Sequence, residues 1–193
     1  HLQVVGDVSM ESNLEIDQNL MVHSKTFLDD DVSMGAHLQV VGDVSMESSL
    51  EIDQNLMVHT KTFLDNDVSM GAHVQVVGDV SMESSLEIDQ NLMVHTKTFL
   101  DNDVSMGAHL QVVGDVSMES NLEVDLNLMV HSKTFLDDDV SMGANLYVEG
   151  DISMGSSLEI DQNLMVRTKT FLDDDVSMGA HLQVIGDVSM ESN

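Results

Sequence analysis

The sequence repeats itself every 36 residues, and this period constrains the fold more than any other property of the chain. The segment HLQVVGDVSMESNLEIDQNLMVHSKTFLDDDVSMGA occupies residues 1–36. Close copies occupy residues 37–72, 73–108, 109–144 and 145–180, and a partial copy occupies residues 181–193. Self-similarity at a fixed period is typical of solenoids and fibres, in which each repeat packs on its neighbours. We therefore expect one continuous repeat array over residues 1–193.

Each repeat divides into six-residue units, which read HLQVVG, DVSMES, NLEIDQ, NLMVHS, KTFLDD and DVSMGA in the first copy. The fourth position is apolar in all 32 units, and the second is aliphatic except at the five Thr26-type positions. This alternation is the pattern of a short strand. Gly, Asn, Asp and Ser follow at the turn positions, and Gly, Asn and Asp tolerate the positive φ of a tight corner. The pattern predicts an all-β fold, namely a β-solenoid (parallel β-helix) of hexapeptide strand-corner units.

The number of units in each coil is the next property to predict. Two units make a 12-residue coil, and three make an 18-residue coil. The repeat matches itself better after a shift of 12 residues than after a shift of 18, mainly because DVSM recurs at Asp7 and Asp31. We therefore expect 12-residue coils in preference to 18-residue coils. Rungs stack roughly 4.8 Å apart, so the array is roughly 77 Å long with 12-residue coils or roughly 50 Å with 18-residue coils. A single chain and an intertwined trimer remain alternatives.

The composition excludes several classes of function. The chain carries 35 Asp and Glu against 6 Lys and Arg, a net charge of −29, which argues against binding to nucleic acid or to an anionic membrane. It has no Cys, and its apolar runs are too short to span a bilayer. We found no catalytic motif, and the nine His recur with the repeat, as a surface ladder does. We expect no enzyme activity, no catalytic residue and no organic cofactor.

The acidic residues suggest one ligand, calcium. A 12-residue coil places Val5-Gly6-Asp7, Asp17-Gln18-Asn19 and Asp29-Asp30-Asp31 on one edge, and every His, Lys and Arg on the other. Carboxylates one rung apart repel unless a cation lies between them, and Ca²⁺ accepts oxygen ligands. The simpler interpretation is a solvated edge that keeps the rod soluble. The candidate calcium ladder comprises Asp7, Asp17, Asp29, Asp30 and Asp31 with the copies Asp65, Asp67, Asp101, Asp103, Asp137, Asp138, Asp139, Asp173, Asp174 and Asp175.

Apolar residues also occur at the outward third position of two units. Repeated exposed apolar groups usually mark a contact surface, so we expect self-association as a homotrimer or a fibre bundle. The predicted assembly surface comprises Met21, Phe27, Met57, Phe63, Met93, Phe99, Met129, Phe135, Met165 and Phe171.

The segment LQVVGDVSMES at residues 2–12, with copies at residues 38–48, 74–84 and 110–120, resembles repeats in fibre proteins of bacteriophages and large marine algal viruses. The short period is also similar to that of bactofilins, which are bacterial polymer-forming β-helix proteins. The hexapeptide pattern resembles that of left-handed β-helix acyltransferases too. In those enzymes the catalytic His lies on a loop that interrupts the helix, whereas this chain has no insertion.

The first resemblance implies a structural fibre or shaft segment, without catalysis, on an extracellular appendage or a virion surface. The receptor of such a fibre is not indicated. One alternative is a self-polymerising cytoskeletal or surface filament of the bactofilin type. Another is a repeat surface that binds calcium or ice. Ice binding favours a flat outward Thr array, but the alternation places Thr26 inward and leaves only Ser9 and Ser33 as recurring outward hydroxyl groups.

Overall fold

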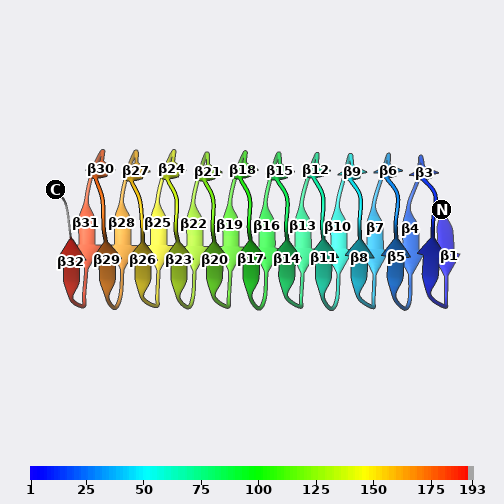
Figure 1. The fold of residues 1–193 in the computed structure, drawn as a ribbon, viewed down its shortest axis with the longest axis horizontal. Helices are drawn as coiled ribbons and strands as arrows, with labels where there is room; N and C mark the ends of the chain where they lie inside the picture. Colours follow the sequence, from blue (N-terminus) through cyan, green and yellow to red (C-terminus); the bar gives the residue numbers. More distant parts are fainter. Residues whose placement is uncertain (191–193) are drawn as a thin grey trace.

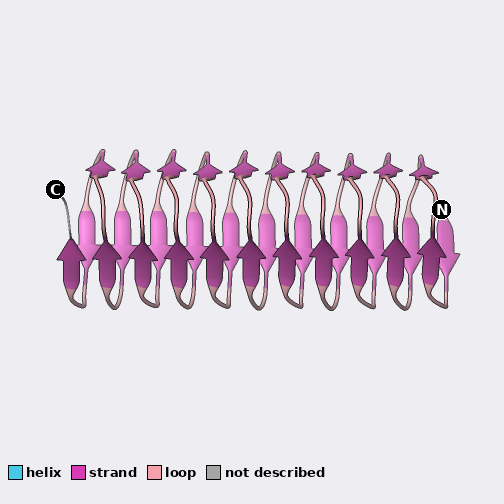
Figure 2. Cartoon of the chain, in the orientation of Figure 1, coloured by secondary structure: helices cyan, strands magenta, loops and turns pink. Residues whose placement is uncertain are grey.

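The chain forms a straight three-sided rod of stacked coils (Figures 1 and 2). The computed structural model describes residues 1–190, and within that range it contains strands but no helix. Each strand is three residues long, and three residues connect it to the next. Each strand pairs in parallel with the third strand before and after it, so the strands form three sheets. The predicted β-solenoid is therefore confirmed.

The three sheets form the sides of the rod, which we name faces A, B and C. Face A contains β1 (Leu2–Val4), β4 (Leu20–Val22), β7 (Leu38–Val40), β10 (Leu56–Val58), β13 (Val74–Val76), β16 (Leu92–Val94), β19 (Leu110–Val112), β22 (Leu128–Val130), β25 (Leu146–Val148), β28 (Leu164–Val166) and β31 (Leu182–Val184). Face B contains β2 (Val8–Met10), β5 (Thr26–Leu28), β8 (Val44–Met46), β11 (Thr62–Leu64), β14 (Val80–Met82), β17 (Thr98–Leu100), β20 (Val116–Met118), β23 (Thr134–Leu136), β26 (Ile152–Met154), β29 (Thr170–Leu172) and β32 (Val188–Met190). Face C contains β3 (Leu14–Ile16), β6 (Val32–Met34), β9 (Leu50–Ile52), β12 (Val68–Met70), β15 (Leu86–Ile88), β18 (Val104–Met106), β21 (Leu122–Val124), β24 (Val140–Met142), β27 (Leu158–Ile160) and β30 (Val176–Met178).

The expected 12-residue coil is wrong, because paired residues lie 18 positions apart. Leu2 pairs with Leu20, and Val8 pairs with Thr26. Stacking requires apolar inward residues but not identical ones, and the outward residues of faces B and C alternate between large and small from one coil to the next. Counting identical residues after each shift therefore favours a coil that is too short. The two DVSM segments that favoured 12 residues lie on different faces, in β2 and β6. A single chain supplies all three sides of the coil.

The core is a continuous column of aliphatic and Met side chains inside the three faces. The first and third residues of each strand point inward, and in the central coils they are buried. Each complete coil contributes six inward side chains, and one of these is Met, either on face B as in Met46 or on face C as in Met34. The two halves of the 36-residue repeat thus have similar core volumes, which explains how they alternate without bending the rod. The five Thr26-type residues are inward and buried, as predicted.

The corners differ from the expectation in their backbone conformation. Among the residues that the structure describes, none has a positive φ, whether Gly or not. Gly is required instead because adjacent coils approach closely at some corners. A Cβ atom on Gly78 would lie 2.2 Å from the carbonyl oxygen of Thr60, and one on Gly107 would lie 2.4 Å from that of Asp89. These glycines therefore leave space for the backbone of the coil below.

Candidate functional site: an acidic trough and the edges of the rod

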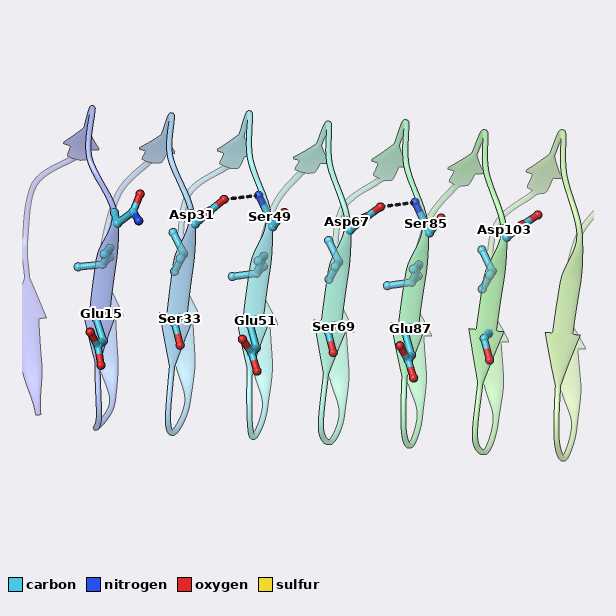
Figure 3. A pocket seen from close by; sticks show the side chains of 18 of the residues that line it. Glu15, Asp31, Ser33, Ser49, Glu51, Asp67, Ser69, Ser85, Glu87 and Asp103 are labelled. Atoms are coloured by element: carbon cyan, nitrogen blue, oxygen red, sulfur yellow. Dashed lines mark hydrogen bonds between the residues drawn. The ribbon is translucent and has the colours of Figure 1, made fainter.

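A shallow trough of about 800 Å³ runs along face C, lined by residues from Asn13 to Glu123. A second hollow of about 330 Å³ continues it from Asn121 to Glu159. Figure 3 shows outward Glu and Ser alternating along face C, with Asp side chains at the adjoining edge. The trough is therefore acidic along its whole length. Aliphatic side chains such as Leu50 also line it.

The edge between faces B and C is held by aspartates that bind the next coil. The carboxylate of Asp67 accepts a hydrogen bond from the hydroxyl of Ser84 at 2.6 Å and one from the backbone N–H of Ser85 at 3.3 Å. Asp31 makes the equivalent contacts with Ser48 and Ser49, and Figure 3 shows both backbone contacts. We call this arrangement the Asp clasp. One carboxylate oxygen in each clasp is engaged in joining coils.

The same clasp occurs at the edge between faces A and B. Asp79 accepts hydrogen bonds from the hydroxyl of Thr96 and from the backbone N–H of Lys97, at 3.2 Å for the latter. These hydrogen bonds lower the pKa of Asp79, and the one from Thr96 has the largest effect. The Lys61 ammonium also lies 3.8 Å from Asp79. The aspartates whose pKa is lowered in this way are Asp7, Asp43, Asp79, Asp115 and Asp151 at this edge, and Asp103 and Asp139 at the B–C edge.

The edge between faces C and A is held by an Asn and His ladder. The side-chain oxygen of Asn19 accepts the backbone N–H of His37, and Nδ1 of His37 accepts the backbone N–H of Asn55, each at 3.3 Å. His109 and Asn127 repeat the second contact at 3.3 Å. All three edges therefore use the first residue of the six-residue unit to bind the next coil. Our sequence analysis missed this role, although the recurrence of Asp, Asn and His at that position was a usable signal.

The predicted calcium ladder does not lie on one edge. The 18-residue coil places Asp7 at the A–B edge, Asp17 at the C–A edge, and Asp29, Asp30 and Asp31 at the B–C edge. The copies Asp65 to Asp175 in the predicted list also lie at the B–C edge. The His1-type residues lie at the C–A edge, whereas the His23-type residues and all six Lys and Arg lie at the A–B edge. In residues 1–190, no group of three His, Asp or Glu side chains is arranged to hold a metal ion.

A ladder of like charges nevertheless runs along the B–C edge. The first residue after each strand of face B is acidic from Glu11 to Asp137, in every coil, and the series is broken by Gly155. Neighbouring carboxylates in this ladder are one rung apart, roughly 4.8 Å along the rod axis. Repulsion between them opposes folding at neutral pH and is screened by salt.

We therefore expect Ca²⁺ or high salt to raise the melting temperature, by roughly 5 °C or more for a chain of this size. Thermal unfolding followed by circular dichroism in dilute buffer, in NaCl and in CaCl₂ of equal ionic strength measures this effect. A larger rise in CaCl₂ than in NaCl indicates bridging of carboxylates, and equal rises indicate screening. A melting temperature that is indifferent to both contradicts the prediction.

Glutamine substitutions separate the ladder from the total charge. Replacing Glu47, Glu83 and Glu119 in the ladder with Gln is expected to raise the melting temperature in dilute buffer. The matched control replaces Glu51, Glu87 and Glu123 with Gln. These three lie on face C with a Ser-bearing coil between each pair, and their replacement is expected to have a smaller effect.

The Asp clasps and the acidic ladder are expected to respond to acid in opposite directions. The pKa of Asp79 is lower in the folded chain than its ordinary value of 3.8, so the folded state binds fewer protons than the unfolded state. The clasp therefore stabilises the fold above pH 3.8, and that stability is lost as the pH falls below this value. In high salt, which screens the ladder, we expect unfolding to become easier as the pH falls below 3.8. Replacing Asp43, Asp79 and Asp115 with Asn is expected to flatten that pH dependence, and an unchanged slope would count against the clasp.

One surface cluster departs from the repeat. Glu149 stands where the other four complete copies have Val, and its carboxylate lies 3.2 Å from Nδ1 of His131 and 3.5 Å from Nη1 of Arg167. The hydroxyl of Tyr147 donates a hydrogen bond to Glu149 at 3.1 Å, and the Arg167 guanidinium lies 5.5 Å from the centre of the Tyr147 ring. The contacts of Glu149 lower its pKa, and the hydrogen bond with His131 has the largest effect. The side chains of this cluster bind one another across three coils.

The predicted outward residues do point outward, but on two faces. The Met21-type residues lie on face A and the Phe27-type residues lie on face B. The Phe side chains are 41–45% exposed. The sequence analysis missed a further exposed apolar series at the A–B edge, formed by Val41, Val77 and Val113. These side chains occupy the coils between those that carry Met and Phe, so exposed apolar groups occur on both sides of the A–B edge and along it.

Comparison of the chain with protein-family models, with curated proteins and with solved structures finds no significant match. Residues 1–190 contain no helix that is long and apolar enough to cross a bilayer.

Proposed function

We propose that this chain is a segment of a structural fibre or shaft, on an extracellular appendage or a virion surface, and that it self-associates laterally. The observation that carries the proposal is the uninterrupted stack of coils. From Leu2 to Met190, every connection between strands is three residues long. One core runs through the described rod, and every coil binds the next by backbone hydrogen bonds and edge ladders.

The chemistry of the surface supports a mechanical role. The Asp, Asn and His side chains at the three edges bind neighbouring coils. Each of these contacts recurs along the rod, so the junctions between successive coils are held by the same kinds of contact. The acidic surface opposes nonspecific aggregation in solution. These properties suit a stiff spacer, which must keep its shape over its length.

Electron microscopy tests the structural role. Negatively stained molecules are expected to be straight rods roughly 50 Å long, and each added 36-residue repeat is expected to lengthen them by roughly 10 Å. Rods that end in a tip or attach to a particle support a shaft. Filaments that grow without limit by end-to-end stacking support the bactofilin-type alternative instead. Compact or irregular particles would reject both.

A further inference from the structure

We propose that face B is an interface between two copies of this chain, in which the Phe side chains of each copy insert between the Phe side chains of the other. The inference rests on the proposed structural role and identifies the partner and the contact surface.

The outward residues of face B alternate between large and small without interruption. Phe27 is paired in register with Ser9 on one side and Ser45 on the other, and the pattern continues to Phe171 and Ser189. Successive Phe side chains are thus two rungs apart, roughly 9.6 Å. Between them lies only a Ser side chain, which leaves a gap on the surface. A second copy of the same chain carries Phe side chains at the same spacing. All of its Phe rings can therefore occupy the gaps of the first copy at the same time.

Neither of the other faces combines an uninterrupted large–small alternation with an uncharged surface. On face A, Met alternates with Gln, which is equally long, and Tyr147 interrupts the series. On face C, the outward residues alternate between Glu and Ser, so two copies of that face repel each other. Face B carries no charged outward residue from Ser9 to Ser189. It is therefore the face on which two equally acidic rods can meet with the least repulsion.

The charges at the two edges of face B select the direction of the partner. All six Lys and Arg lie at the A–B edge, and the B–C edge carries the acidic ladder without a cation. When two rods meet through face B with their axes parallel, each A–B edge faces the partner's B–C edge. When the axes are antiparallel, the two acidic ladders face each other. Charge therefore favours the parallel pair.

A stagger of one coil completes the fit. Without a stagger, a parallel pair places Phe opposite Phe at the same height. A shift by one coil places Phe opposite Ser along the whole face, and it places Lys61-type residues at the height of Glu47-type residues in the partner. The stagger is half of the 36-residue repeat, so the same contacts recur along the rod however long the array is.

The strands of face B form a strip roughly 50 Å long and roughly 10 Å wide, so a pair buries roughly 1,000 Å² in total before the edges are counted. This area is at the lower end for a specific interface. We therefore expect weak pairing that strengthens with each added repeat.

Filling the gaps tests the interface. The triple variant Ser45→Phe, Ser81→Phe and Ser117→Phe makes face B more apolar but removes its gaps. Sedimentation equilibrium is expected to show at least a tenfold weaker association than for the unchanged chain. The control places the same substitutions in the same VSM strand sequence on face C, at Ser69, Ser105 and Ser141. That variant is expected to keep the original association.

The other outcomes overturn the proposal. They are an unchanged chain that stays monomeric, equal effects of the two triple variants, or stronger association of the face B variant. The filled variant could lose its β-sheet signal in circular dichroism. In that case the test uses the triple variant Phe63→Ser, Phe99→Ser and Phe135→Ser, which is expected to be monomeric. Single rods seen by microscopy in either variant leave the structural role intact, so the structural role and the face B interface fail separately.

Disulfide cross-linking tests direction and stagger, because the chain contains no Cys. A mixture of the Ser45→Cys and Phe63→Cys variants is expected to form mixed disulfides, since the staggered parallel pair places these positions opposite each other. A mixture of Ser45→Cys and Phe135→Cys reports an antiparallel pair displaced by one coil from the centred position, which also sets Phe opposite Ser, and it is expected to give none. Cross-linking in the second mixture instead of the first would overturn the parallel arrangement.

Discussion

Replacing the five buried threonines with valine is expected to stabilise the rod by roughly 1 kcal/mol per site, or roughly 5 kcal/mol in total. The hydroxyl groups of these residues lie in the core without a hydrogen-bond partner: Thr26, Thr62, Thr98, Thr134 and Thr170. Valine has nearly the same shape and already occupies the same inward position of face B in alternate coils, as in Val44 and Val80. Urea denaturation followed by circular dichroism measures the change.

The same substitution at the surface provides the control. Thr60, Thr96 and Thr168 lie at the A–B edge, where their hydroxyl groups donate hydrogen bonds to Asp43, Asp79 and Asp151. Changing these three to Val is expected to destabilise the rod. A core variant that is less stable than the unchanged chain would show that the buried hydroxyl groups have partners, such as internal water.

Adding a methyl group at the crowded corners is expected to have the opposite effect. In Gly78, Gly114 and Gly150, a Cβ atom would lie 2.2–2.3 Å from a carbonyl oxygen of the adjacent coil. The backbone of that coil must move to accept it, and overpacking of this kind typically destabilises by 1–3 kcal/mol per site. The triple Gly→Ala variant is therefore expected to lose several kcal/mol in urea denaturation.

Gly6 is the matched control for this variant. It occupies the same place in the first coil, but a Cβ atom there would meet nothing within 4 Å. Gly6→Ala is expected to be neutral or slightly stabilising, because Ala restricts the unfolded chain. Similar losses at Gly6 and Gly78 would indicate a requirement for backbone conformation rather than for space between coils.

The strand positions could be predicted from the sequence because the core imposes one rule on every unit. The second and fourth positions must be accommodated inside the rod, so they are apolar or Thr throughout, and each predicted strand is present in the described residues. The turn positions were also predicted, but their conformation was not. Gly and Asp occur there for close approach and for hydrogen bonding to the next coil, as in Gly78 and Asp79.

The coil size could not be predicted from internal identity, because stacking favours unlike neighbours on the surface. Lys25 lies beside Asp43, and Phe27 lies beside Ser45. These pairs lower charge repulsion and crowding, but they reduce identity at the true period of 18 residues. The candidate sites followed from the coil size, so the error placed on one predicted edge aspartates that lie on three edges of the rod.

The near-identity of the repeats has a consequence for how the chain finds its register. A segment displaced by one whole repeat meets almost the same core and edge partners, so misaligned pairing retains most of the native stabilisation. Such a slip also allows segments to be exchanged between neighbouring chains during folding. The surface cluster of His131, Tyr147, Glu149 and Arg167 is an exception. If the chain slips by one repeat, Glu149 no longer lies beside Arg167. This cluster distinguishes the native alignment from its displaced copies and marks one position along an otherwise uniform rod.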